Sequence, residues 1–237
     1  MLSVVLPCYN EKDNLPGLFK RLDQVAASSD ELEIILVNNG STDGSAEVFE
    51  REISVRDQKV FKVTTVEKNI GYGFGILSGL RSATGDVLAV THADRQTDPM
   101  DVLKAMDIYK HEDDEHLLVK GTRVNRKMSE AVFSYGMGLL ASLALGERLK
   151  EINAQPKLFS RKFFYKVHEK APLDFSLDLY FLYCAKQSGR IIEFPVQFSK
   201  RIAGEAKGGS GSSWKVRRKL IKRSFSYIFE LKKQIKQ

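Results

Sequence analysis

Short apolar runs alternate with amphipathic stretches along the first half of the chain. The apolar runs predict β-strands at 3–7, 33–37, 60–66, 86–94 and 116–121. The stretches between them carry apolar residues at helical spacing, first from Leu15 to Ala26, then from about Ser45, from Gly71 to Arg81, and from Asp98-Pro99 onward. Strands that alternate with helices pair in parallel through right-handed crossovers. The pattern therefore predicts an α/β domain with a largely parallel sheet.

The second half of the chain is richer in helical patterns. An apolar stretch at 133–149 and a second stretch at 177–189 predict helices, and residues 190–198 predict a strand. Residues 200–213 are rich in Gly and Ser, which predicts a flexible loop. Residues 214–237 predict a basic amphipathic helix, with an apolar face formed by Leu220, Ile221, Phe225, Ile228, Phe229 and Leu231.

Polar segments follow three of the predicted strands. CYNE, NNGSTD and THADRQ each come directly after an apolar run, and the last of them places His92, Asp94 and Gln96 on alternate positions. The carboxyl ends of parallel strands meet at one edge of a sheet, where open α/β folds bind their ligands. These side chains therefore either decorate a loop or hold a metal ion at that edge.

Charge is distributed unevenly along the 237 residues. The formal net charge is +7, yet residues 200–237 carry twelve Lys and Arg and only two Glu, so the first 199 residues carry −3. A cationic amphipathic helix is typical of a segment that lies on an anionic membrane surface. Packing on the protein's own core or on a second subunit, in a homodimer, is the alternative. Charge alone also allows a nucleic-acid role, but the chain has no recognisable reader motif.

Compartment and membrane topology follow from composition. No run approaches the roughly 18 apolar residues of a membrane span. The only cysteines, Cys8 and Cys184, lack metal-like spacing, which indicates a reducing environment without a disulfide framework. We therefore expect a cytoplasmic protein, peripheral on the inner face of the cell membrane if the tail helix binds lipid.

Four segments together resemble the family 2 glycosyltransferases, which have the GT-A fold. They are LPCYNE (6–11), VNNGSTDGS (37–45), NIGYGFGILSGLRSATGD (69–86) and HADRQTDP (92–99). Within that family the resemblance is strongest to the polyprenyl-phosphate branch, similar to dolichol-phosphate mannose synthases, through GTR (121–123), KLFSR (157–161) and EFPVQFSKRIAGEAK (193–207). The resemblance implies a mixed, mostly parallel sheet flanked by helices. It also implies a GT-A domain at 1–199, with a nucleotide-sugar half at about 1–122 and an acceptor half at about 123–199.

The resemblance implies roles on the donor side. Positions matching the family's nucleotide-binding segments are Pro7, Tyr9, Glu11, Asn38, Asn39, Gly71 and Ala93. A nucleoside diphosphate that leaves a sugar needs its growing charge neutralised by a cation or by Arg and Lys. His92 stands where the family has the first Asp of Asp-x-Asp. Since imidazole suits manganese better than magnesium, we expect His92, Asp94 and Gln96 to hold a divalent metal, with Mn²⁺ favoured over Mg²⁺.

On the acceptor side, Arg123 and Ser134 match the branch's acceptor-phosphate positions, and Arg201 and Lys207 match residues that close over the donor diphosphate. A phosphomonoester is already anionic at neutral pH and needs no base. A sugar hydroxyl needs one, and Asp178 is the candidate. Asp94, Asp178 and Arg201 are thus the candidate catalytic residues. Transfer to a hydroxyl of a cell-surface glycan is the alternative reaction.

Two further alternatives concern the class of protein. The unusual His92 and the paired Asn38 and Asn39 also fit an inactive protein that only binds nucleotide sugars. The glycine cluster at 71–75 suggests a dinucleotide-binding dehydrogenase, but its spacing is GxGxG rather than GxGxxG and it does not lie in the first strand–helix turn. We therefore reject the dehydrogenase reading.

Overall fold

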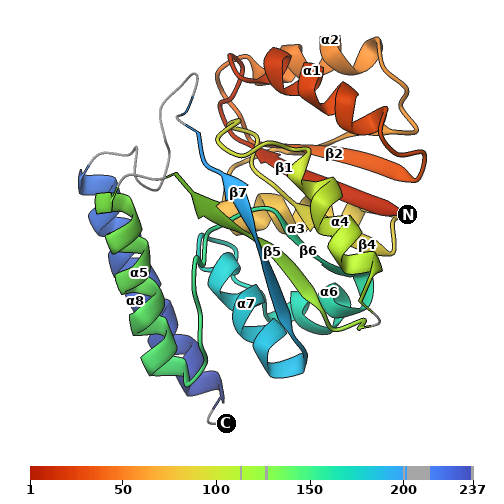
Figure 1. Ribbon diagram of the computed structural model, residues 1–237. Helices are drawn as coiled ribbons and strands as arrows, with labels where there is room; N and C mark the ends of the chain where they lie inside the picture. The colour runs from red at the N-terminus through yellow and green to blue at the C-terminus, as the bar shows by residue number, and fades with distance from the viewer. Residues whose placement is uncertain (113, 126–127, 200, 202–213, 236–237) are drawn as a thin grey trace.

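The computed structural model describes residues 1–112, 114–125, 128–199, 201 and 214–235. Its centre is a seven-stranded sheet with the order β3-β2-β1-β4-β6-β5-β7 (Figure 1). The strands are β1 Leu2–Cys8, β2 Leu32–Asn39, β3 Phe61–Val66, β4 Val87–Val90, β5 Leu118–Val124, β6 Lys157–Ser160 and β7 Ile191–Gln197. β1 pairs in parallel with β2 and β4, β2 with β3, and β5 with β7. The predicted mixed, mostly parallel sheet is confirmed.

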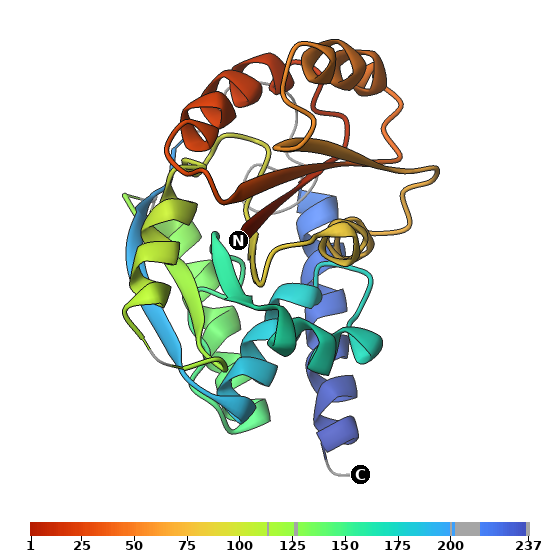
Figure 2. The ribbon, with the colours of Figure 1, turned by 90° about the vertical axis from the view of Figure 1, so that its right-hand side faces the viewer.

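Helices cover both faces of the sheet (Figures 1 and 2). They are α1 Leu15–Ala26, α2 Ser45–Ser54, α3 Tyr72–Ser82, α4 Asp101–Lys110, α5 Met128–Leu145, α6 Arg161–Val167, α7 Leu177–Ser188 and α8 Trp214–Ile235, with a 3₁₀ turn η1 at His168–Lys170. Neighbouring strand residues point to opposite faces, so Val4 and Leu6 pack with α1, α2 and α4, whereas Val5 packs with α3, α6 and α7. The result is a sheet buried between two helical layers.

Strand β6 was missing from the sequence prediction, which treated KLFSR only as a family motif. The strand has four residues and is followed at once by α6, so it is too short to show an alternating pattern. It runs antiparallel to both β4 and β5. Its first residue, Lys157, therefore lies at the edge where the parallel strands end, opposite Val90 of β4 and Lys120 of β5.

Helix α8 packs on the protein's own core. Tyr227, Ile228 and Leu231 are buried in the same cluster as residues of α5 and α7, and α5 and α8 lie side by side (Figure 1). The apolar face predicted for this helix is therefore divided, because Ile228 is buried whereas Phe225 and Phe229 remain exposed. No helix in the described part of the chain has the length and apolar character needed to cross a bilayer.

Candidate active site at the carboxyl edge of the sheet

The edge of the sheet where the parallel strands end carries strained backbone. Four non-glycine residues of the described chain have a left-handed conformation: Asn10 after β1, Arg95 after β4, Asn125 after β5 and Glu151 before β6. All four stand in loops at this edge. Such conformations cost free energy and concentrate at functional sites, where the surrounding structure holds them in place.

Two acidic side chains from different strand ends meet one arginine at this edge. The Arg201 guanidinium donates through Nη1 to Asp94 Oδ2 at 3.2 Å and through Nη2 to Glu11 Oε1. Asn14 Nδ2 donates to the other oxygen of Glu11 at 2.6 Å. The side chain of Glu11 is 9% exposed, that of Arg201 14% and that of Asp94 17%. The sequence prediction named all three charged residues, and the structure brings them together.

The segment after β7 is also fixed by its backbone. Ser199 donates its N–H to the carbonyl of Gln96 at 2.8 Å, and Gln96 Nε2 donates to the carbonyl of Ser199 at 3.2 Å. The N–H of Gln96 in turn donates to Asp94 Oδ1 at 3.1 Å. Gln96 therefore positions Asp94 and the segment that carries Arg201. Lys207, predicted at the donor diphosphate, lies outside the described residues.

The loops after β1 and β2 hold each other. The N–H of Asn10 donates to Ser41 Oγ at 3.1 Å, and the N–H of Thr42 donates to Asn10 Oδ1 at 2.8 Å. Asn38 Oδ1 accepts from the N–H of Ser41 at 3.2 Å, which fixes the orientation of its amide. The predicted nucleotide-binding residues Pro7, Tyr9 and Ala93 stand on β1 or in the loops that follow β1 and β4.

Asn39 links β2 to the start of α3. Its Nδ2 donates to the carbonyl of Gly71 at 3.1 Å, and a Cβ at Gly75 would lie 2.7 Å from the Asn39 side chain. Gly71 has a φ of +153°, and a Cβ there would lie 2.1 Å from the carbonyl oxygen of Leu173. The glycines of GYGFG thus allow close approach of α3 to the neighbouring loop and to β2. Whether Asn39 contacts a nucleotide stays a prediction.

Arg123 stands at the end of β5 and faces an acid. Its Nε donates to Glu151 Oε2 at 2.9 Å, and its guanidinium lies 5.3 Å from the ring centre of Phe198. Ser134, the other predicted acceptor residue, lies on α5 and is half-buried. An acceptor phosphate at Arg123 would have to compete with the Glu151 carboxylate.

Asp178 is enclosed by partners that the sequence analysis did not identify. Lys157 Nζ lies 2.5 Å from Asp178 Oδ1, and Gln155 Nε2 donates to the same oxygen at 3.0 Å. Asp178 is 3% exposed and Lys157 1% exposed. Burial lowers the pKa of Lys157, while the Asp178 charge opposes that shift. The only available signal was a lysine in the apolar strand KLFS, where a buried charge requires a partner.

Lys120 forms a second buried cation next to Lys157. Its ammonium lies 3.3 Å from Glu193 Oε1. Burial lowers the pKa of Lys120 to about 8, although the charge of Glu193 opposes the shift. Burial and the nearby Glu11 and Asp94 carboxylates raise the pKa of the Cys8 thiol. Cys8 is therefore a neutral core side chain, consistent with the two cysteines being free.

The predicted metal ligands do not form a complete cage. No group of three His, Cys, Asp or Glu side chains suited to a metal occurs in the described part of the chain. Asp94 offers one carboxylate, half of which faces Arg201, and the Gln96 carbonyl is already an acceptor. One carboxylate fits a cation that is completed by substrate phosphates, since Mg²⁺-type ions commonly bind through one or two carboxylates plus phosphate oxygens.

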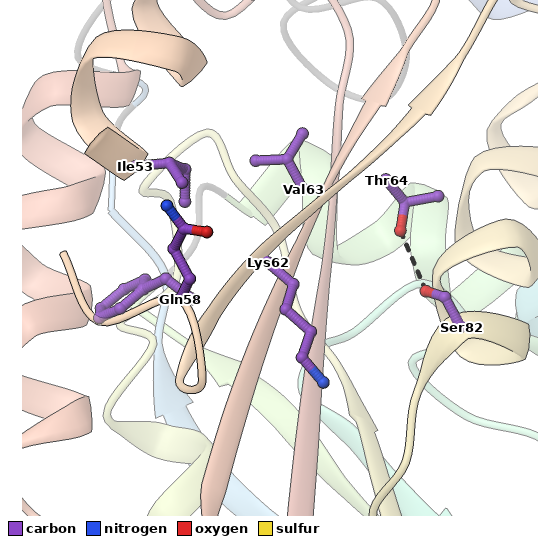
Figure 3. A pocket seen from close by; sticks show the side chains of 7 residues that line it. Ile53, Gln58, Lys62, Val63, Thr64 and Ser82 are labelled. Carbon is purple, nitrogen blue, oxygen red and sulfur yellow. Dashed lines mark hydrogen bonds between the residues drawn. The ribbon is translucent and has the colours of Figure 1, made fainter. Parts of the chain in front are cut away.

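A separate hollow lies along β3, the edge strand of the sheet. It is lined by Ile53, Gln58, Phe61, Lys62, Val63, Thr64 and Ser82 (Figure 3). Thr64 and Ser82 share a hydrogen bond of 3.0 Å across it. The lining contains one cation and no carboxylate, so it lacks the opposed charges found at Asp94. The carboxyl edge is therefore the candidate active site.

The chain is similar to known glycosyltransferases. The family model described as glycosyl transferase family 2 matches residues 3–170. A dolichol-phosphate mannosyltransferase from Pyrococcus furiosus is 30% identical over 87% of this chain and 58% of its own length. An undecaprenyl-phosphate 4-deoxy-4-formamido-L-arabinose transferase from Klebsiella pneumoniae is 27% identical over 87% of this chain and 62% of its own length. The chain thus spans about three fifths of these relatives.

Solved structures share the fold. A mannosyltransferase from Pyrobaculum calidifontis, in complex with GDP-Man and Mn²⁺, superposes with a TM-score of 0.60 at 19% identity, covering 85% of this chain and 57% of that one. Glucosyl-3-phosphoglycerate synthase from Mycobacterium tuberculosis, with Mn²⁺ and UDP bound, gives 0.62 at 18% identity, covering 86% and 72%. From the match to residues 3–170 and the GT-A architecture, this chain belongs to glycosyl transferase family 2.

Proposed function

We propose that this chain transfers a sugar from a nucleoside-diphosphate donor to a polyprenyl phosphate, with inversion at the anomeric carbon. The two relatives aligned over most of the chain are named for transfer to dolichol phosphate and undecaprenyl phosphate. The observation that carries the choice of acceptor is the enclosure of Asp178 by Lys157 and Gln155. A carboxylate held in this way is a poor general base, and a phosphate acceptor needs none.

The donor diphosphate would occupy the space beside Asp94. A divalent cation held by Asp94 would supply charge neutralisation for the departing diphosphate, and Arg201 would give up its carboxylate partners to donate to phosphate oxygens. Glu11 and Asn14 would then keep the loop after β1 in place. His92 makes no hydrogen bond in the described part of the chain, and as a further ligand it would favour Mn²⁺ over Mg²⁺.

The acceptor phosphate would bind at Arg123. Arginine recognises phosphate through two parallel N–H donors, and Arg123 already uses Nε for Glu151. In-line attack requires the acceptor oxygen on the face of the sugar opposite the diphosphate, so Arg123 and Arg201 act as separate cationic subsites. The substrate would then be drawn from a membrane, which agrees with a cytoplasmic protein that is peripheral on the inner face.

The direct test supplies purified chain with radiolabelled UDP- and GDP-sugars and a short-chain polyprenyl phosphate. The expected result is a labelled lipid product that requires Mn²⁺ and disappears in EDTA. Asp94→Asn should reduce turnover by at least 100-fold without changing the unfolding midpoint, since its partner Arg201 keeps Glu11. Equal turnover in EDTA would remove the metal from the mechanism, and equal rates with Mg²⁺ alone would remove the Mn²⁺ preference.

The same assay separates the alternatives. Label that appears in an oligosaccharide but never in lipid would favour a glycan hydroxyl as acceptor. Nucleotide binding by thermal shift, without transfer or donor hydrolysis under any condition, would favour the inactive nucleotide-sugar-binding protein.

A further inference from the structure

Two buried oxygens at the carboxyl edge of the sheet have no hydrogen-bond partner. They are the hydroxyl of Tyr72, the first residue of α3, and Oε1 of Gln155, in the loop before β6. No atom of the described chain meets either oxygen at hydrogen-bonding distance and angle, so they do not bond to each other. Buried polar groups are almost always paired in folded proteins, and an unpaired one costs stability. Two such oxygens together indicate a partner from outside the chain.

Neighbouring contacts hold both side chains in place. The ring of Tyr72 stacks on Phe175, with ring centres 4.7 Å apart and planes inclined by 6°. Gln155 is 1% exposed, and its Nε2 donates to Asp178 Oδ1 at 3.0 Å. That hydrogen bond decides which end of the amide carries the oxygen. Tyr72 thus offers an O–H group, and Gln155 offers a carbonyl oxygen, in fixed orientations.

The Tyr72 hydroxyl is close to both parts of the candidate active site. Burial raises the pKa of this hydroxyl well above its ordinary value of 10.0, and the charges of Asp178 and Asp94 raise it further. Gln155 opposes the rise, which indicates that its amide is near the hydroxyl. The hydroxyl therefore stays protonated, and it is near Asp178 as well as the carboxylate proposed at the donor diphosphate.

We propose that Tyr72 and Gln155 bind a hydroxyl group of the transferred sugar and thereby select the donor by the sugar it carries. A sugar hydroxyl can accept from Tyr72 and donate to Gln155 Oε1, so it satisfies both oxygens. This inference rests on the proposed function, because the sugar is bonded to the diphosphate that would lie beside Asp94. A sugar that lacks this hydroxyl would leave both oxygens unpaired, and sites of this kind reject such analogues.

Entry of the sugar requires a change at the edge, because both oxygens are enclosed. Arg201 is the side chain expected to move, since in the proposed function it leaves Asp94 for the phosphates. The sugar would then follow the diphosphate into the site.

Two other partners would also satisfy these oxygens. A water molecule could bridge them, or a rotation of the Gln155 amide could bring its oxygen to the Tyr72 hydroxyl. The rotation is opposed by the hydrogen bond from Gln155 to Asp178. With either partner, the affinity for a nucleotide sugar would not depend on the Tyr72 hydroxyl.

The test compares Tyr72→Phe with wild type by calorimetric titration in the presence of Mn²⁺. The ligands are UDP, GDP, UDP-glucose, UDP-galactose and GDP-mannose. The substitution removes the hydroxyl and keeps the ring that stacks on Phe175. We expect unchanged affinity for the nucleoside diphosphates and a loss of at least about fivefold for the nucleotide sugar that wild type binds best, because one buried hydrogen bond is lost.

Tyr227→Phe is the matched control. The Tyr227 hydroxyl is also buried and unpaired in the described part of the chain, but it lies in the core between α7 and α8. Removal of that hydroxyl should leave the affinity for every ligand unchanged. The unfolding midpoint of both variants is measured without ligand.

Deoxy analogues of the best-bound nucleotide sugar identify the hydroxyl that is recognised. Wild type should bind one analogue about tenfold or more weakly than the parent, because its unpaired oxygens disfavour that sugar. Tyr72→Phe should bind this analogue and the parent with similar affinity. Such coupling between a sugar hydroxyl and Tyr72 is not expected of a residue that only supports the fold.

The outcomes separate this inference from the proposed function. The inference is overturned if Tyr72→Phe binds nucleotide sugars as wild type does, or if it weakens UDP or GDP binding equally. A lower unfolding midpoint with unchanged sugar affinity would make the hydroxyl a structural partner of Gln155. Selective loss of sugar affinity, without labelled lipid product from wild type, would refute the polyprenyl phosphate acceptor alone. Lipid product from wild type, with unaltered sugar selectivity in Tyr72→Phe, would refute this inference alone.

Discussion

Replacing Asp178 by Asn tests whether the buried Lys157–Asp178 pair stabilises the folded protein at the candidate active site. The substitution keeps the size of the side chain and leaves the Lys157 ammonium, 1% exposed, without a counter-charge. Breaking a buried pair costs roughly 3–5 kcal/mol. Deprotonation of Lys157 sets an upper limit on this loss of stability. A lysine of ordinary pKa 10.5 becomes neutral at pH 7 at a cost of about 5 kcal/mol, since each pKa unit is worth about 1.4 kcal/mol. We therefore expect a loss of ~3–5 kcal/mol.

The assay is urea unfolding at pH 7 of the Asp178→Asn, Lys157→Met and Lys157→Met/Asp178→Leu variants. Each single change should lower the free energy of unfolding, and the double change should recover most of it, because no uncompensated charge remains. Gln155 loses its acceptor in the double variant, so a residual loss of about 1 kcal/mol is expected. Losses of less than ~1 kcal/mol in both single variants, or a double variant as unstable as the two losses added, would refute the reasoning.

Activity separates this supporting role from general-base catalysis. Measured well below its unfolding midpoint, Asp178→Asn should retain transfer to polyprenyl phosphate within about tenfold of wild type, since removing a general base typically costs 10²–10⁴-fold. A greater loss in a folded variant would restore Asp178 as the base for a hydroxyl acceptor. Glu115→Gln, which breaks the exposed pair with Lys162, is the control and should leave the unfolding midpoint unchanged.

Three further predictions test other contacts. Burial would raise the pKa of Glu33, but hydrogen bonds from Lys62 and Ser3 outweigh it and lower the pKa from 4.5 to about 2. The ionised Glu33 therefore adds ~3 kcal/mol to the free energy of unfolding above pH 4.5, and this contribution is lost as the pH falls toward 2. Glu33→Gln should flatten that part of the acid-unfolding curve. Gly71→Ala should lower the unfolding midpoint and weaken nucleotide binding in a titration, because its Cβ would lie 2.1 Å from a carbonyl oxygen. Arg201→Gln should bind Mn²⁺ at least fivefold more tightly than wild type in the absence of nucleotide, because the cation that competes for Asp94 is removed. Electron paramagnetic resonance of free Mn²⁺ measures this affinity, and an unchanged value would contradict competition between Arg201 and the metal.

The fold was predictable from sequence where the pattern was long and local. The strands at 33–37 and 60–66 have clear apolar runs, and the helix beginning near Leu15 shows strict spacing. Strand β6 could not be found in this way, because its four residues gain their place from pairing with β4 and β5 rather than from their own pattern. The predicted strand at 86–94 is shorter in the structure, ending at Val90, where the chain turns into the loop of Asp94.

The candidate site was predictable in its outline and not in its pairings. Glu11, Asp94 and Arg201 were each identified from the motifs, but 190 residues separate Glu11 from Arg201, and nothing in the sequence links them. The same holds for Lys157 and Asp178, whose contact depends on the antiparallel direction of β6. Residue types indicate which chemistry is available, whereas the topology decides which charges meet.

These pairings have a consequence for substrate binding. In the described part of the edge, Arg201 pairs with Glu11 and Asp94. Arg123 pairs with Glu151. Both arginines therefore already have carboxylate partners. A bare diphosphate would displace these carboxylates and leave them uncompensated in a partly buried site, which is costly. A diphosphate that carries its own divalent cation instead supplies the charge that Asp94 loses when Arg201 turns to the phosphates. The charge balance of the edge thus favours joint binding of donor and metal over binding of either one alone.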